Sequence, residues 1–267
     1  MGEIMYNQSS VLIIGVLFVS LVLAIEAGYR LGCKAYTSAT EAATSHINAI
    51  QGSMLGVLAL LLGFTFSLSL QRYDSRSEAV VNEANAIGTA YLRAQLLPPS
   101  IRSEVQALLR SYLDGRVQEG TIPLSQEAER QALLAKASQD QDTLWRYALQ
   151  AAEEDKSPTT SGLFIQSLNE LIDSFGRRNA ALGHVPEMVM LLLYGTFLMA
   201  WGIVGYAAGI AGHRVSSAAY IMLVLVLLVV FIIIDLDRPR RGLIEIDQTS
   251  LTDLQTAIHT AQEEDAH

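Results

Sequence analysis

The chain has 267 residues, of which 51% are hydrophobic, and it carries a net charge of −9. This composition is too apolar for an ordinary soluble domain and too polar for a chain that lies wholly within lipid, so it favours several membrane spans joined to a water-soluble region. Lys and Arg nowhere form the clusters that bind nucleic acid, so no nucleic-acid partner is expected. The single cysteine, Cys33, excludes an intrachain disulfide.

Four apolar segments approach or exceed the roughly 20 residues that a spanning helix needs. They cover residues 11–27, 47–70, 188–211 and 215–234. The leader before the first segment contains an acidic residue and no Lys or Arg, unlike a signal peptide. We therefore expect a retained first span, a transmembrane hairpin over 1–70 and a second hairpin over 188–234.

An even number of spans places both termini on the same side of the membrane as the intervening region 71–187. The basic residues close to the span ends on that side are Arg72, Arg76, Arg177, Arg178, Arg238, Arg240 and Arg241, and those on the other side are Arg30, Lys34 and Arg214. Because basic residues near the membrane remain in the cytoplasm, the termini and the region 71–187 are predicted to be cytoplasmic. The protein is expected to cross the membrane several times.

The region 71–187 reads as a set of amphipathic helices. In its first part, an apolar stripe of residues spaced three and four apart continues directly from the second span and ends at Pro98-Pro99. Further helices are expected from Ile101 to about 115–120, from Ser125 to about Glu154, and from Thr160 or Ser161 towards Pro186. No run alternates with the period of a strand. The predicted fold class is therefore all-α, with four transmembrane helices, a helical cytoplasmic domain between the second and third spans, and an acidic cytoplasmic tail over 235–267.

Small residues recur at helical spacing in two of the spans. Such spacing lets helix backbones approach closely in lipid. The residues concerned are Gly52, Gly56 and Gly63 in the second span and Gly205 and Gly209 in the third. The packing that they indicate is either within one subunit or between subunits.

The second span also carries a polar face where it leaves the membrane. Thr65, Ser69, Arg72 and Arg76 follow one another at spacings of four, three and four. A ring of such helices would present hydroxyls and then arginines to a central path, as anion-selective pores do, with Phe64 and Phe66 as an apolar constriction. The alternative is ordinary: hydroxyls often bond within their own helix, and arginines are common at membrane interfaces.

No catalytic, metal or cofactor motif stands out. The pair Asp235 and Asp237 suits a divalent ion by ligand type, but neighbouring arginines such as Arg238 favour a cap at the end of the fourth span. We expect no metal, no cofactor and no enzymatic activity. In the region 71–187, Asn82, Asn85 and Thr89 form a polar stripe that is either solvated or a recognition face.

Several segments together resemble the bacterial bestrophin-like membrane family. They are LLGFTFSLSLQRYDSR at 61–76, VVNEANAIGTAYLR at 80–93, LNELID at 168–173, HVPEMV at 184–189 and DLDRPRRG at 235–242. The second segment contains Glu83 and Asn85, and the last contains Asp235, Asp237, Arg238 and Pro239. Only residues 120–160 lack a segment of this kind.

The resemblance implies an oligomeric anion channel of the bacterial inner membrane, with a cytoplasmic helical domain and a pore flanked by second-span helices. This agrees with the independent interpretation of Thr65, Phe66, Ser69 and Arg72. The acidic cluster 263–265 lies at the extreme terminus and not directly after the last span, which argues against calcium gating. The leading hypothesis is a homo-oligomeric channel in the lipid bilayer that passes small ions, chiefly anions. The alternative is a membrane-anchored interaction or signalling module, and an enzyme resting on Asp235 and Asp237 ranks third.

Overall fold

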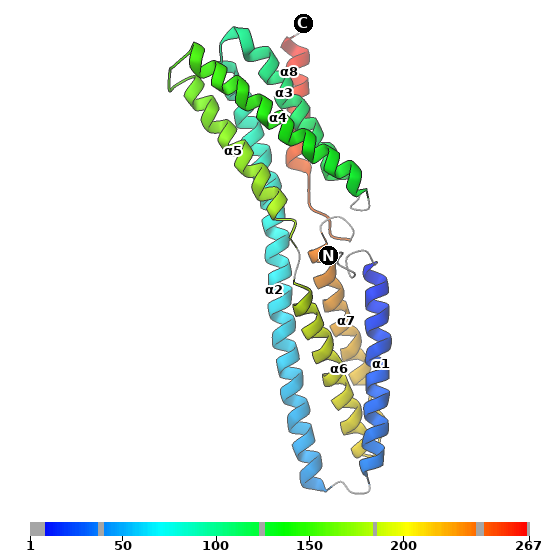
Figure 1. Ribbon diagram of the computed structural model, residues 1–267. Helices are drawn as coiled ribbons and strands as arrows, with labels where there is room; N and C mark the ends of the chain where they lie inside the picture. The colour runs from blue at the N-terminus through cyan, green and yellow to red at the C-terminus, as the bar shows by residue number, and fades with distance from the viewer. Residues whose placement is uncertain (1–8, 37–39, 123–125, 184–185, 239–242, 266–267) are drawn as a thin grey trace. The chain divides into compact units, whose positions relative to one another are not determined.

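The computed structural model describes residues 9–36, 40–122, 126–183, 186–238 and 243–265. Over these residues the chain is all-helical and contains no strand (Figure 1). The elements are α1 (Ser10–Ala35), α2 (Glu41–Arg93), the 3-10 turn η2 (Ala94–Leu96), α3 (Pro99–Thr121), α4 (Glu127–Glu154), α5 (Ser161–Ala180), α6 (Glu187–Ile210), α7 (Ser217–Asp237) and α8 (Thr249–Asp265). They form two compact units, one from Met1–Arg72 and His184–Arg238 and the other from Tyr73–Gly183 and Pro239–His267.

Four helices, α1, α2, α6 and α7, are long and apolar enough to cross a membrane. Each expected span lies inside one of these helices or extends past its end by at most two residues. The helix α2 has 53 residues and is therefore about 80 Å long, more than twice the roughly 30 Å of a hydrocarbon core. It is unbroken because the chain has no proline before Pro98, so the backbone hydrogen bonds continue through the change from apolar to polar sequence.

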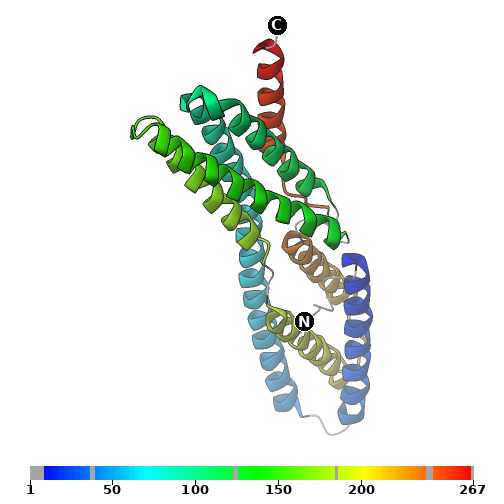
Figure 2. The same ribbon diagram turned by 45° about the horizontal axis from the view of Figure 1, so that its top comes forward.

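In the first unit, glycines bring α1 and α6 into backbone contact. A Cβ atom on Gly28 would lie 2.0 Å from the carbonyl oxygen of Gly202, and one on Gly205 would lie 2.1 Å from that of Ile25. Farther along, Gly209 lies against the backbone of α1 in the same way. Figures 1 and 2 both show the C-terminal halves of α1 and α6 side by side. Gly205 and Gly209 thus pack within the subunit, against the backbone of α1, whose own glycines Gly28 and Gly32 the sequence analysis did not single out.

The second unit has its own apolar core. It is built from the C-terminal part of α2 together with α3, α4, α5 and α8. Its fully buried members include Ile87, Leu109, Leu144, Phe164 and Leu168. Since these side chains come from four helices, the core fixes the four helices relative to one another.

The segment after the last span is more than an acidic tail. Residues Thr249–Asp265 form α8, and its Leu251 and Ile258 are buried in the core of the second unit. Their spacing, with Leu254 between them, gives one apolar stripe on a short helix. The excess of acidic residues in this segment hid that stripe in the sequence analysis.

The helix starts differ in detail from the expected caps. Thr160 occupies the N-cap position of α5, but its hydroxyl donates to the carboxylate of Asp155 and accepts no capping hydrogen bond from a backbone N–H of α5. Gln126 precedes α4, and Ser125 lies outside the described residues. The hydrogen bond of Thr160 to Asp155 stabilises the loop that precedes α5.

The α1–α6 contact makes a first prediction. Gly28→Ala places a methyl group on the backbone of α6, so we expect the protein to lose at least about 1–3 kcal/mol of stability, as overpacked sites do. Thermal unfolding in detergent measures this loss. Gly15→Ala is the matched control, because no atom lies within 4 Å of a Cβ at Gly15 of the same helix. Equal unfolding temperatures for the two variants would contradict the packing described.

Candidate functional site

The expected polar face of α2 divides into residues with different surroundings. In the first unit Thr65 and Ser69 are buried, whereas Phe64 is 66% exposed. Phe66 is half-buried and packs against the apolar core of the unit. The two phenylalanines therefore do not share one face of the helix.

The two hydroxyls differ in their hydrogen bonds. Thr65 donates to the carbonyl oxygen of Leu61 at 2.8 Å, which is the ordinary bond within a membrane helix. Ser69 is fully buried, and among the described residues its hydroxyl has no hydrogen-bond partner. Because a buried polar group normally has a partner, Ser69 is the unusual one of the pair.

Three glycines in the first-unit part of α2 face outwards. Gly52, Gly56 and Gly63 are exposed, and no atom lies within 4 Å of a Cβ placed on any of them. They therefore differ from Gly205 and Gly209, because no other part of the described chain packs closely against them. We refer to these three residues as the α2 glycine stripe.

The two arginines of the expected polar face also differ. Arg72 is half-buried at the end of the first unit. Arg76, in the second unit, is 2% exposed and donates from Nε to the carbonyl oxygen of Ala181 at 3.0 Å and from Nη2 to that of Gly183 at 2.9 Å. These carbonyls follow the C-terminus of α5, where a cation is favoured. Arg76 thus joins α2 to α5.

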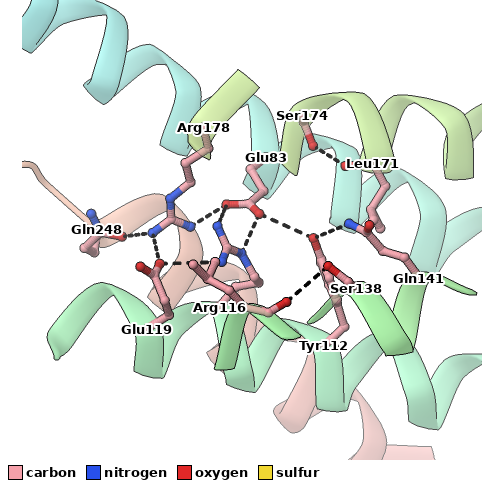
Figure 3. A network of polar contacts seen from close by, with 11 residues as sticks. Glu83, Tyr112, Arg116, Glu119, Ser138, Gln141, Leu171, Ser174, Arg178 and Gln248 are labelled. Atoms are coloured by element: carbon pink, nitrogen blue, oxygen red, sulfur yellow. Dashed lines mark hydrogen bonds and ion pairs between the residues drawn. The ribbon is translucent and has the colours of Figure 1, made fainter. Parts of the chain in front are cut away.

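A second site lies deeper in this unit. Figure 3 shows two carboxylates, Glu83 and Glu119, enclosed with the guanidinium groups of Arg116 and Arg178. All four side chains are at most 5% exposed. We call these four residues the buried ion quartet. Its formal charges sum to zero, which is the condition for keeping ions inside a protein.

Glu83 is the central member of the quartet. Its Oε1 lies 2.7 Å from Nε of Arg116, and its Oε2 accepts a short hydrogen bond from Arg178. Glu119 lies 3.5 Å from each of the two arginines. The Arg116 guanidinium also lies over the ring of Phe175, 4.9 Å from its centroid.

Polar side chains close the quartet on both sides. Tyr112 donates to Glu83 at 3.4 Å and accepts a hydrogen bond from Gln141 at 3.1 Å. On the other side Arg178 donates to the side-chain oxygen of Gln248 at 3.1 Å. The network therefore joins α2, α3, α4, α5 and the residue that precedes α8 (Figure 3).

The quartet determines the ionisation of its members. Burial favours the neutral form of Glu83, but the attraction of Arg116 and Arg178 and their hydrogen bonds outweigh burial and lower the pKa of this carboxyl. Burial, followed by the negative charge of Glu83, raises the pKa of Tyr112. Burial acts against the charge of Arg116, but Glu83 raises the pKa of that arginine overall.

The sequence analysis named Glu83 within a family segment and Arg178 among the basic residues near the span ends, but it did not pair them and missed Arg116 and Glu119. A signal was present in α3, where Tyr112, Arg116 and Glu119 continue the apolar stripe of Val105 and Leu109. Charged residues on the buried face of a helix predict a buried network.

The stripe of Asn82, Asn85 and Thr89 lines a polar groove. Its other wall comes from α5, including Gln166 and Glu170, and its volume is about 310 Å³. Arg93 closes one end and donates to the carbonyl oxygen of Leu163 at 2.9 Å. The groove offers both donors and acceptors on the surface of the second unit.

The acidic residues at the end of α7 belong to no metal site in the described part of the chain, where no group of three or more His, Cys, Asp and Glu side chains comes together. Asp235 and Asp237 are buried. The backbone N–H of Arg238 donates to the carbonyl of Asp235 at 3.1 Å, and its Nη1 donates to Ser10 at 3.2 Å. Arg238 thus joins the end of α7 to the start of α1. Pro239 lies outside the described residues.

A family model for the Bestrophin-like domain matches residues 16–251, which include most of both units. The chain belongs to the Bestrophin-like family. With its four apolar helices, it is a membrane protein. No curated protein sequence matches the chain.

Solved structures of a bacterial Bestrophin homolog from Klebsiella pneumoniae, each carrying a single substitution, share the fold. One is 17% identical, with a TM-score of 0.56 over 90% of this chain and 96% of that chain. Another is 15% identical, with a TM-score of 0.55 over 93% of this chain and 99% of that chain. At these identities the likeness is one of fold.

The quartet makes a second prediction. Glu83→Gln leaves Arg116 and Arg178 buried beside a single carboxylate, so we expect a loss of about 3–5 kcal/mol of stability. Chemical unfolding of the full-length protein measures it. Glu170→Gln is the control, because Glu170 and its partner Arg177 are exposed and such pairs contribute at most about 1 kcal/mol. Equal losses would contradict the account of the quartet.

The lowered pKa of Glu83 makes a third prediction, on pH. A carboxylate whose pKa is lower in the folded than in the unfolded chain stabilises the fold above the unfolded pKa, which is 4.5 for an ordinary glutamate. This stabilisation is lost as the pH falls through the folded-state pKa. Stability of the natural protein should therefore fall towards acid more steeply than that of Glu83→Gln, as unfolding measured over a pH series will report. Parallel pH curves would contradict the assignment.

Proposed function

We propose that the chain assembles into a homo-oligomeric channel that conducts small anions, with α2 of each subunit beside the path. The observation that carries this proposal is the α2 glycine stripe, which faces outwards on an apolar helix with no atom of the described residues within 4 Å of a Cβ placed on it. Membership of the Bestrophin-like family supports it.

The stripe favours contact with another copy for a physical reason. Lipid offers no hydrophobic gain on helix association, so membrane helices pack through close van der Waals contact, which small residues allow. In this chain Gly28, Gly32, Gly205 and Gly209 already serve that purpose between α1 and α6. A second set at the same kind of spacing, left open, is suited to an α2 helix of a neighbouring subunit.

The ion path that we propose follows α2 towards the second unit. Phe64, which is adjacent to Gly63 and exposed, supplies the apolar constriction, whereas Ser69 is fully buried within the subunit and does not face this path. Arg72 supplies the positive charge that attracts anions. Arg76 is removed from this role, because its guanidinium is engaged by the carbonyls after α5.

The proposed orientation places the termini and the second unit in the cytoplasm of a bacterial cell, with the spans in the inner membrane. The excess of arginines near the span ends on that side supports it. The quartet and Arg76 then hold the water-side part of α2 in a rigid helical domain.

The polar groove supports a second candidate function, a membrane-anchored module that binds a partner through the second unit. Asn82, Asn85 and Thr89 line it with Gln166 and Glu170 and present hydrogen-bonding groups of both kinds. This candidate predicts that the folded, assembled protein carries no current.

Current through planar bilayers tests the channel. The purified full-length protein should conduct with a preference for chloride over sodium, and Arg72→Glu should lower that preference at least about tenfold, a change of ~1.4 kcal/mol. Arg177→Glu makes the same charge change on an exposed residue of α5 and should leave the preference unaltered. A folded oligomer that does not conduct would refute the channel, and indifference to Arg72→Glu would refute the role of that residue.

The size of the assembly tests the glycine stripe. Gly56→Leu should shift the protein in detergent from oligomer to monomer without lowering the unfolding temperature of the subunit, since no described atom lies within 4 Å of a Cβ at Gly56. Light scattering coupled to gel filtration measures the mass. Gly15→Leu, at an equally open glycine of α1, should retain the oligomer. An unchanged oligomer in Gly56→Leu would exclude the stripe from the interface.

A further inference from the structure

The first unit contains an apolar hollow that the packing of its four helices leaves unfilled. Its volume is about 320 Å³, and it lies among α1, α2, α6 and α7. Leu17 and Phe197 line its inner wall, and Leu62 reaches it from α2. Every lining residue is aliphatic, methionine, phenylalanine or tyrosine.

The hollow follows from the way α1 and α6 cross. At their C-terminal halves glycines bring the two backbones together, so the helices touch. Towards their N-termini the facing residues are Ile13 and Leu17 on one helix and Leu193 and Phe197 on the other. These bulky side chains hold the backbones apart, and a wedge of space remains between them.

The depth of the hollow corresponds to one leaflet of a bilayer. On α6 its lining begins at Met190 and ends at Phe197, ten residues after the helix starts at Glu187. On α7 it ends at Val230, seven residues before Asp237. At 1.5 Å per residue these positions lie about 10–15 Å from the helix ends. Half of a hydrocarbon core is about 15 Å.

Water is a poor occupant of this space. A volume of 320 Å³ equals that of about ten waters in the liquid, but a buried water needs 2–4 polar partners and the walls supply almost none. An empty hollow would forfeit the dispersion contacts of its walls. The occupant must therefore be apolar.

The hollow opens sideways. Among its lining residues Leu12, Val16 and Leu191 are 50%, 57% and 59% exposed, and they continue directly into the lipid-facing surface of α1 and α6. We propose that one acyl chain of a membrane phospholipid, from the leaflet in which α1 begins and α7 ends, fills this hollow. The chain is bound by its length and shape, and the headgroup is not selected, because Arg238 at this end is buried and bonded to Ser10.

Native mass spectrometry of the delipidated protein tests the proposal. The protein is titrated with phosphatidylglycerol whose chains have 16 to 18 carbons, as in ordinary membranes, and are about one leaflet long. Val16→Trp fills the hollow and should weaken binding of the tightest lipid on each subunit at least about tenfold. Val19→Trp is the control, because Val19 is 56% exposed on the same helix and does not line the hollow. Binding that is equal in the two variants would overturn the proposal.

A second pair of variants guards against misfolding. Leu191→Trp should repeat the effect, and Leu192→Trp, 58% exposed beside it but outside the hollow, should not. Phosphatidylethanolamine with the same chains should bind equally well, and phosphatidylglycerol with six-carbon chains should not bind, since they span less than half of the ~15 Å leaflet. Dependence on the headgroup would contradict a chain-binding hollow. Loss of the oligomer in Val16→Trp and Leu191→Trp, with lipid binding retained, would show that a second copy covers it.

Discussion

A carboxylate inside a protein must be paired, and the pairing of Glu83 organises the second unit. Glu83 is contributed by α2, and its partners come from α3 and α5, so neutralising one charge fixes three helices. Tyr112, Gln141 and Gln248 complete the network and extend it to α4 and to the segment before α8. Because an unpaired charge would cost several kcal/mol, these helices cannot separate without a large penalty.

In the first unit α2 packs through apolar side chains. There α2 contributes Leu58 and Leu62 to the apolar core and leaves its glycines open. Arg76 then bonds to the carbonyls after α5. One unbroken helix thus has an apolar packing face, an unoccupied glycine stripe and a buried charged end, and this combination supports an assembly in which α2 carries both contact and conduction.

The sequence predicted the spans well, because the free energy of transfer into lipid is a local property that a run of apolar residues reports directly. It predicted the helices of the second unit from apolar stripes and cap residues, which are also local signals. It missed the quartet, whose ion pairs join residues 33 and 95 positions apart and depend on tertiary packing. It also missed α8, because the acidic residues there outweighed the stripe of Leu251, Leu254 and Ile258.

The spacing of small residues shows where another helix can approach closely. It does not show which helix approaches. Gly205 and Gly56 have the same kind of spacing in the sequence, yet Gly205 lies against the backbone of α1 and Gly56 has no described atom within 4 Å of an added Cβ. Disulfide cross-linking tests the central claim directly, since Cys33→Ser removes the only cysteine and Gly56→Cys then adds one on the stripe. Oxidation in native membranes should give covalent dimers, whereas Gly15→Cys should stay monomeric. A Gly56→Cys protein that also stays monomeric would contradict the account of α2 as the helix at which subunits meet.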